Sequence, residues 1–183
     1  MPPKRSVLLQ TRSIPLSVCF RFFALTLLKA PLKILDLLDR FYLVMLSMKA
    51  KYGLRAMASL AREYGNGPLL IADIAEKERI PRKFLELILL DLKKKGFLHS
   101  KKGKGGGYYL NRLPSTISVD QLIRALDGPL ALLPCVSQMA YERCEECPDE
   151  QTCGIRNVFK EVRQATISVL ERTTLADLAT RRA

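Results

Sequence analysis

The sequence predicts a mainly α-helical fold that contains one small two-stranded sheet. Apolar residues recur at spacings of three and four in several segments after residue 48, which is the period of amphipathic helices. Two short apolar runs flank a loop of lysines and glycines, HSKKGKGGG, as the strands of a hairpin do. A last long apolar stripe follows an acidic, cysteine-rich segment. The order is therefore helices, a hairpin, and a long helix near the C-terminus.

Charge is distributed unevenly along the 183 residues, whose formal net charge is +12. Residues 45–112 hold 15 Lys and Arg against 6 Asp and Glu, whereas residues 113–183 hold 8 against 10. The hydrophobic content of 48% is enough to form a folded core. Because the positive charge is concentrated in one part of the chain, it favours a polyanionic partner over an ordinary solvated surface.

Residues 1–44 form a basic and apolar N-terminal extension that fits the rest of the pattern poorly. Charged residues such as Arg21 and Lys29 interrupt every apolar window of the roughly 20 residues that a transmembrane helix needs. We therefore predict no membrane span and a cytoplasmic protein. The extension is interpreted as disordered or as a mis-assigned start ahead of Met45 or Met48. A targeting segment and a regulatory arm remain alternatives.

Three helices are expected next. Lys49–Tyr64 carries a helical apolar stripe that a Gly-Asn-Gly-Pro turn ends. A short helix follows within LLIADIAEKERI, and a third runs over Pro81–Lys95, where proline at the first position costs little. The tight turn between the last two is typical of a helix-turn-helix, whose second helix enters the major groove of DNA.

The hairpin after these helices predicts a wing. Phe97–Leu98 and Tyr108–Leu110 are expected to pair as strands. Lysines in the loop between them supply charge, and its glycines allow the backbone to approach phosphates. The loop lacks the spacing of a nucleotide-binding Walker motif. A plain three-helix bundle would have no wing, so we predict a winged helix-turn-helix DNA-binding domain over residues 45–128.

Three further segments complete the predicted fold. Ser118 caps a helix that ends at Asp127, before Gly-Pro. Residues 155–183 are expected to form a dimerisation helix of about five turns and a last short helix, Leu175–Thr180, capped by Thr173 or Thr174. A monomer of this size has no other element to bury the long apolar stripe, which favours a twofold homodimer.

Residues 129–154 are interpreted as a cysteine-rich sensor loop. Four cysteines fall within it, without a secretory signal that would favour disulfides, and the candidate metal ligands are Cys135, Cys144, Cys147 and Cys153. Thiolates bind iron–sulfur clusters or zinc. Free thiols and a thiol oxidoreductase using the C-E-E-C pair are alternatives, but the βαβ context of such enzymes is missing. With one histidine, His99, the chain is predicted not to be an enzyme.

Several runs resemble the Rrf-two (Rrf2) family of bacterial winged-helix repressors, over about Met45–Leu178. They are MKAKYGLRAMASLA, IADIAEKERIPRKFLELILLDLKKKGFLHSKKGKGGGYYL, SVDQLIRALDG, the spaced cysteines and TTLADL. The resemblance implies a homodimer that reads a near-palindromic double-stranded DNA operator. It also implies an iron–sulfur cluster as a possible cofactor, because some members bind one and others do not; zinc is a weaker candidate.

The resemblance and the charge pattern together give the expected interface. The residues expected to contact DNA are Lys49, Arg82, Lys83, Phe84, Glu86, Lys101, Lys102, Lys104 and Gly105. Leu87 stands where some relatives have a base-reading glutamine. Cys147 and Cys153 match the last two cluster cysteines of the family, whereas Cys144 lies too near and Cys135 rather far to match the first. Arg156 replaces the histidine that serves some relatives as fourth ligand.

Overall fold

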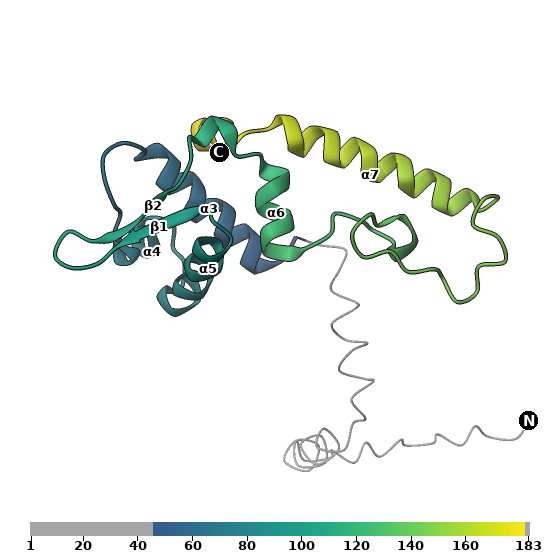
Figure 1. The fold of residues 1–183 in the computed structure, drawn as a ribbon, viewed down its shortest axis with the longest axis horizontal. Coiled ribbons are helices and arrows are strands. Elements are labelled where there is room, and N and C mark those ends of the chain that lie inside the picture. The colour runs from purple at the N-terminus through teal and green to yellow at the C-terminus, as the bar shows by residue number, and fades with distance from the viewer. Residues whose placement is uncertain (1–45, 182–183) are drawn as a thin grey trace, which may run out of the picture. The chain divides into compact units, whose positions relative to one another are not determined.

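The computed structural model describes residues 46–181 (Figure 1). The N-terminal extension predicted over residues 1–44 lies outside this range. Among the described residues, no helix is long and apolar enough to span a bilayer.

Three helices open the described part of the chain. They are α3 (Met48–Arg62), α4 (Ile71–Lys77) and α5 (Arg82–Lys94), each close to its predicted bounds. Ser47 caps α3, because its Oγ accepts a hydrogen bond of 3.0 Å from the N–H of Ala50. Between α3 and α4, Gly65 and Gly67 adopt φ angles of 91° and 104°, which favour glycine. The predicted helix-turn-helix is therefore confirmed.

The wing is a two-stranded antiparallel sheet of β1 (Leu98–Lys101) and β2 (Gly107–Leu110). The first strand is longer than the sequence predicted. His99 pairs with Tyr109, and Lys101 pairs with Gly107, so residues expected in the loop belong to the strand. Because Lys101 pairs with Gly107, the loop at the tip of the wing consists of residues 102–106 and is shorter than predicted.

The remaining α-helices follow the predicted order, and the structure adds two short 3-10 helices that the sequence did not predict. They are η3 (Pro114–Thr116), α6 (Val119–Asp127), η4 (Pro134–Val136), α7 (Gly154–Arg172) and α8 (Leu175–Thr180). Ser118 caps α6 by accepting from the N–H of Gln121, as expected. Of the two threonines that could cap α8, Thr174 does so, in a capping box with Asp177.

One hydrophobic core joins these elements. Its buried residues come mainly from α3, α4, α5, α6, α8 and both strands, and the largest fully buried ones include Met57, Ile74, Leu85, Ile88, Leu89, Leu92, Leu98, Ile117, Leu122 and Leu175. The helices α3 and α6 cross at Gly53, where an added Cβ would lie 2.5 Å from Leu126 Cδ1. Glycine therefore allows the close approach of these two helices.

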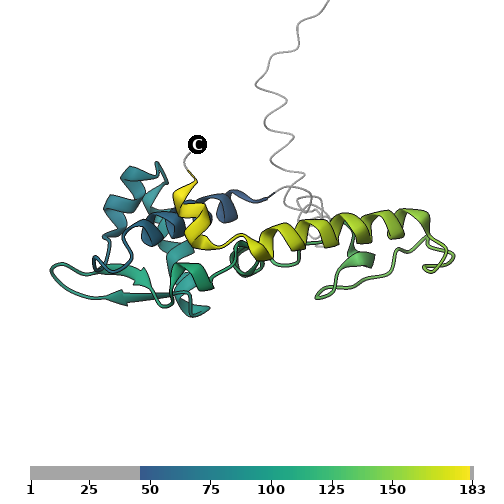
Figure 2. The same ribbon diagram turned by 90° about the horizontal axis from the view of Figure 1, so that it is seen from above.

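The C-terminal helix α8 returns to the start of the described chain and packs against α3 (Figure 2). Two backbone hydrogen bonds secure it, from Val119 N to Thr173 O at 2.9 Å and from Leu175 N to Ile117 O at 2.8 Å. They fix the C-terminal end of α7 to the core. From there α7 runs away from the wing, beside the loop that carries η4 (Figure 2).

Candidate nucleic-acid interface

The helix α5 presents an exposed face that begins directly after the turn of the helix-turn-helix. Arg82, Lys83 and Glu86 all lie on this face, as the sequence predicted. The Arg82 Nε–Glu86 Oε1 distance is 3.2 Å, so these two side chains form an ion pair one turn apart. Lys83 has no carboxylate partner among residues 46–181. Its charge is therefore free to meet a phosphate.

The opposite face of α5 is anchored in the core. Phe84 is half-buried, and its ring meets that of Tyr52 edge to face with centroids 5.9 Å apart. The structure thus places Phe84 in the packing between α3 and α5, whereas its predicted neighbours on α5 are exposed. Its part in DNA contact stays a prediction.

Lys49 lies at the start of α3 and is engaged with α5. Its Nζ is 2.7 Å from Asp91 Oδ2, and Lys95 Nζ lies 3.2 Å from the same oxygen. The hydrogen bond from Lys49 lowers the pKa of Asp91 below its ordinary value, and Lys95 adds to this. Lys49 therefore helps to hold α3 against α5, and a contact with DNA would compete with this pair.

The wing carries the other predicted cations. Lys102, Lys104 and Gly105 lie in the loop at its tip, and neither lysine pairs with a carboxylate in the described part of the chain. Lys101 lies one residue earlier, in β1. Lys93 of α5 donates a hydrogen bond of 2.7 Å to Ser100 Oγ of β1. This contact links the wing to the helix that follows the turn.

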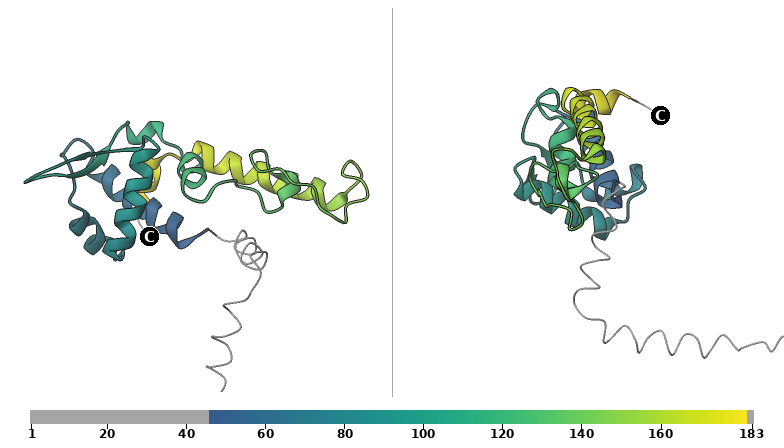
Figure 3. Two further views of the ribbon diagram at one scale, coloured as in Figure 1. Left: turned by 60° about the horizontal axis from the view of Figure 1, so that its bottom comes forward. Right: turned by 90° about the vertical axis from the view of Figure 1, so that its right-hand side faces the viewer.

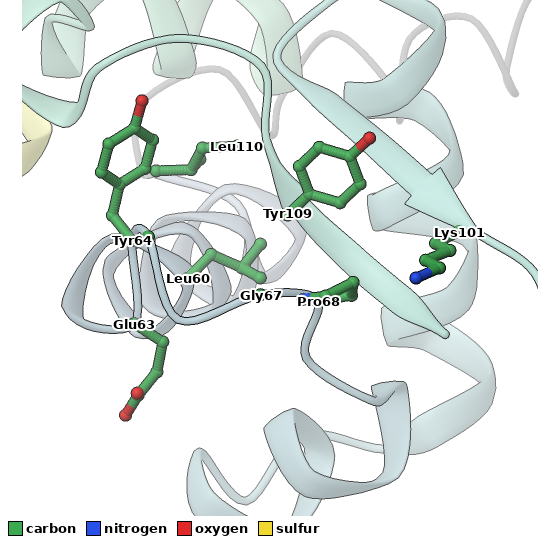
Figure 4. A pocket seen from close by; sticks show the side chains of 9 residues that line it. Leu60, Glu63, Tyr64, Gly67, Pro68, Lys101, Tyr109 and Leu110 are labelled. Carbon is green, nitrogen blue, oxygen red and sulfur yellow. The ribbon is translucent and has the colours of Figure 1, made fainter. Parts of the chain in front are cut away.

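A cavity of about 480 Å³ lies where the wing meets the end of α3. Leu60, Tyr64 and Pro68 line it from α3 and the following turn, and Lys101 and Tyr109 line it from the two strands (Figure 4). Lys101 faces this cavity, which separates it from the two lysines of the tip.

The four predicted metal ligands lie in the segment between α6 and α7. Cys135, in η4, is buried and lies beside the exposed Cys144, whereas Cys147 lies beside Cys153, and both of these are partly exposed. Within residues 46–181, no three His, Cys, Asp or Glu side chains gather as a metal site would require. Their thiol chemistry nevertheless fits iron or zinc.

The pKa values of two of these thiols are shifted upward. Burial raises the pKa of Cys135, and neighbouring Cys144 raises it further. Partial burial and Cys153 raise the pKa of Cys147. A thiol with a raised pKa carries little thiolate at neutral pH and is a poor nucleophile. The raised pKa of Cys147 argues against a thiol oxidoreductase that uses this residue as its nucleophile.

Two arginines of α7 tie the cysteine loop to that helix, which the sequence did not predict. Arg156 Nε donates to the carbonyl of Cys135 at 3.2 Å, and Arg163 donates to the carbonyl of Val136. Cys153 caps α7, because its Sγ accepts from the N–H of Arg156 at 3.5 Å. Each arginine lies more than 20 residues from its carbonyl partner in the sequence, so no local pattern indicates these hydrogen bonds. The loop and the N-terminal half of α7 therefore form one hydrogen-bonded unit (Figure 3).

Much of α7 has no cover in the described chain. Of the 19 residues of α7, only Ile167 is buried within the described chain. The exposed apolar side chains follow a spacing of three, four, three and four: Ile155, Val158, Val162, Ala165 and Val169. This is the a and d pattern of a coiled-coil seam.

A helix-turn-helix with uncommitted cations, followed by a basic wing, defines the class of winged-helix DNA-binding regulators. Residues 46–181 match the Rrf2 family, described as an iron-dependent transcriptional regulator. The chain therefore belongs to the Rrf2 family, and the resemblance noted from the sequence is confirmed.

Known proteins of this family resemble the chain over most of its length. An rrf2-like HTH-type transcriptional regulator of Rhodobacter capsulatus is 42% identical over 137 residues, covering 73% of this chain and 91% of its own. The structure of CymR, the global cysteine regulator of Bacillus subtilis, superposes with a TM-score of 0.64 at 31% identity, over 76% of this chain and 99% of its own. T. potens IscR gives 0.59 at 29% identity, over 76% and 93%. These relatives confirm the winged-helix fold, and the family consists of regulators rather than enzymes.

Proposed function

We propose that the chain is a homodimeric transcriptional repressor that binds a near-palindromic operator in the bacterial cytoplasm and responds to the state of its cysteine loop. The observation that carries this proposal is the position of α7. Its C-terminal end is fixed to the DNA-binding core, and its N-terminal half holds the cysteine loop. A change in the loop can therefore reach the reading helices through one rigid element.

The exposed seam of α7 supports the homodimer. A helix with apolar residues at every a and d position gains stability by burying them against a second copy. An antiparallel or parallel pairing of two such helices generates twofold symmetry. Two copies of α5 would then read two half-sites related by the same symmetry, which is why a near-palindrome is expected.

The wing and α5 support contact with phosphates. Lys83, Lys102 and Lys104 are exposed cations without carboxylate partners in the described range. When such side chains bind phosphates, they displace the counterions condensed on the DNA. This release contributes affinity that does not depend on the base sequence. Repression follows if the bound dimer occupies a promoter.

An iron–sulfur cluster is the proposed cofactor of the loop. Cys147 and Cys153 would hold it, with Cys135 or Cys144 as a third ligand. When bound, a cluster supplies redox-active iron on thiolate ligands. The match to a family described as iron-dependent, and the likeness to IscR of T. potens, support it.

The chain's own residues would then carry the signal. Cys153 Sγ caps α7 by accepting a hydrogen bond from the N–H of Arg156. If this sulfur bound a metal, the hydrogen bonding of the N–H groups in the first turn of α7 would change. Arg156 contacts both the cap and the carbonyl of Cys135, so it connects the two ends of the loop. A shift of this hydrogen-bonded unit would alter the spacing of the two reading heads.

Zinc or free thiols form the second candidate. Four thiols in one loop are also a zinc donor set, and the likeness to the global cysteine regulator CymR favours regulation without a cluster. In either case the chain would bind DNA in the same way.

The test is a purification of the full chain without oxygen, followed by iron, sulfide and zinc analysis, a visible absorption spectrum and a DNA-binding titration. A cluster regulator should contain iron and sulfide, absorb visible light, and change its operator affinity when the cluster is removed. Cys147→Ala should abolish the absorption, whereas Cys19→Ala, outside the loop, should leave it unchanged. A colourless protein without iron after reconstitution would overturn the cluster, and zinc in its place would support the second candidate.

A further inference from the structure

We propose that Leu87 of α5 is a specificity-determining residue that recognises the methyl group of a thymine in the major groove, with Leu90 beside it. This inference rests on the proposed binding of DNA by α5 and deepens it. It assigns a class of base to one exposed position of that helix.

The first observation is the exposure of two leucines on a helix whose other aliphatic side chains are buried. The side chain of Leu87 is 64% exposed and that of Leu90 is 43% exposed, whereas Leu85, Ile88 and Leu89 are at most 1% exposed. A single exposed leucine needs no explanation. Two of them one turn apart, in the middle of α5, form an apolar patch on the face that the helix-turn-helix turns outward.

The second observation is the charge around this patch. Lys83, Leu87, Leu90 and Lys94 follow each other at spacings of four, three and four, so they lie along one line of the helix. Neither lysine has a carboxylate partner in the described part of the chain. An apolar centre between two free cations suits a groove whose walls are phosphates and whose floor is made of base edges.

The third step is chemical. Leucine has no hydrogen-bonding group, so it cannot recognise adenine, guanine or cytosine by their donors and acceptors. In the major groove, thymine alone offers an apolar group, the C5 methyl. The neighbouring Glu86 is paired with Arg82 at 3.2 Å, which leaves Leu87 as the unengaged side chain of that turn. Apolar contact with a methyl group is therefore the recognition available to it.

The size of the effect follows from the burial of one methyl group. Removing such a group from an apolar contact weakens binding roughly fourfold. In a twofold dimer the contact occurs once in each half-site, so removing both methyls should weaken binding roughly fifteenfold, the square of the single effect.

The experiment uses the full chain and an operator obtained by selection from random double-stranded DNA. Each thymine is then replaced by deoxyuridine, which deletes the methyl and keeps the base pair. We expect about fourfold weaker binding at one symmetric position of each half-site. Leu87→Ala should bind the thymine operator more weakly and no longer distinguish thymine from deoxyuridine there. Leu113→Ala, which truncates another exposed leucine outside α5, should behave as wild type.

Four results would overturn the inference. An operator that is selected but insensitive to every deoxyuridine would refute it and leave the proposed function standing. The same holds if Leu87→Ala keeps full discrimination, or if it alters the oligomeric state without altering DNA binding, which would make the patch a contact between proteins. Failure to select any operator would overturn the proposed function as well.

Discussion

Leu69 and Tyr108 exchange two backbone hydrogen bonds, each 2.9 Å long, although they lie on opposite sides of the helix-turn-helix in sequence. This bridge adds the segment before α4 to the edge of the wing. The wing is therefore joined to α4 as well as to α5. We expect the reading helix and the wing to move together when the protein binds DNA.

Gly107 makes this bridge possible. It adopts a φ of +150°, and an added Cβ would lie 2.1 Å from the carbonyl oxygen of Leu69. Gly107→Ala should therefore displace the wing and lower the free energy of unfolding by roughly 1–3 kcal/mol. Urea unfolding measures the change in the free energy of unfolding. The affinity for DNA should fall because the wing is displaced.

Gly105→Asn is the matched control. Gly105 has a φ of +73° with nothing within 4 Å of an added Cβ, and asparagine tolerates this backbone region. Its free energy of unfolding should stay near that of wild type. If Gly107→Ala were equally stable, the bridge would not constrain the wing.

The lysines at the tip of the wing should bind phosphates. Lys102→Ala should weaken binding to operator and to unrelated DNA by a similar factor, because phosphate contacts carry no sequence information. The slope of log affinity against log salt should become shallower by about 0.9 for each protomer. Fluorescence anisotropy at several salt concentrations measures both.

Lys160→Ala serves as its control, since it removes the same charge from α7, far from the wing in sequence and off its apolar seam. We expect an unchanged salt slope for this variant. A wild-type slope in Lys102→Ala would show that the tip does not contact DNA.

The seam of α7 should hold two copies together. Val162→Glu places a charge at its centre, and a buried unpaired charge costs several kcal/mol. The dissociation constant of the dimer should rise at least roughly a hundredfold, as measured by sedimentation equilibrium. Lys160→Glu, which introduces the same side chain off the seam and a larger change in charge, should remain dimeric. A dimeric Val162→Glu protein would place the interface elsewhere.

The pair of Lys49 and Asp91 should make stability depend on pH. The pKa of Asp91 is lowered in the folded state, so the pair stabilises the protein above the ordinary value of 3.8 and loses this effect as the pH falls through the lower folded value. Lys49→Met should reduce the free energy of unfolding at neutral pH by roughly 0.2–1 kcal/mol, since both side chains are partly exposed. The difference from wild type should shrink below pH 3.8. A difference that is constant with pH would contradict the assignment.

Periodicity and capping residues were enough to predict the order of the elements. The stripe of α5 and the caps at Ser118 and Thr174 depend on neighbours within four residues, so the sequence contains them directly. The wing was also predictable, although its first strand is longer because the pairing partner of Lys101 is set by the turn geometry.

Contacts between distant residues were not predictable in this way. The ties from Arg156 and Arg163 to η4, and the pairing of Lys49 with Asp91, join residues whose spacing has no regular period. The burial of Phe84 against Tyr52 likewise depends on how α3 crosses α5. The contacts of Lys49 and Phe84 decide which predicted site residues are free to bind DNA.

The most direct test of the account is selection of a binding sequence from random double-stranded DNA by the full chain. We predict enrichment of a near-palindrome whose half-sites lie about one helical turn, or a multiple of it, apart. Lys83→Ala should weaken binding to that sequence, whereas Lys160→Ala should not. A pool without any enriched sequence, bound with equal affinity before and after selection, would contradict the claim that α5 and the wing read DNA.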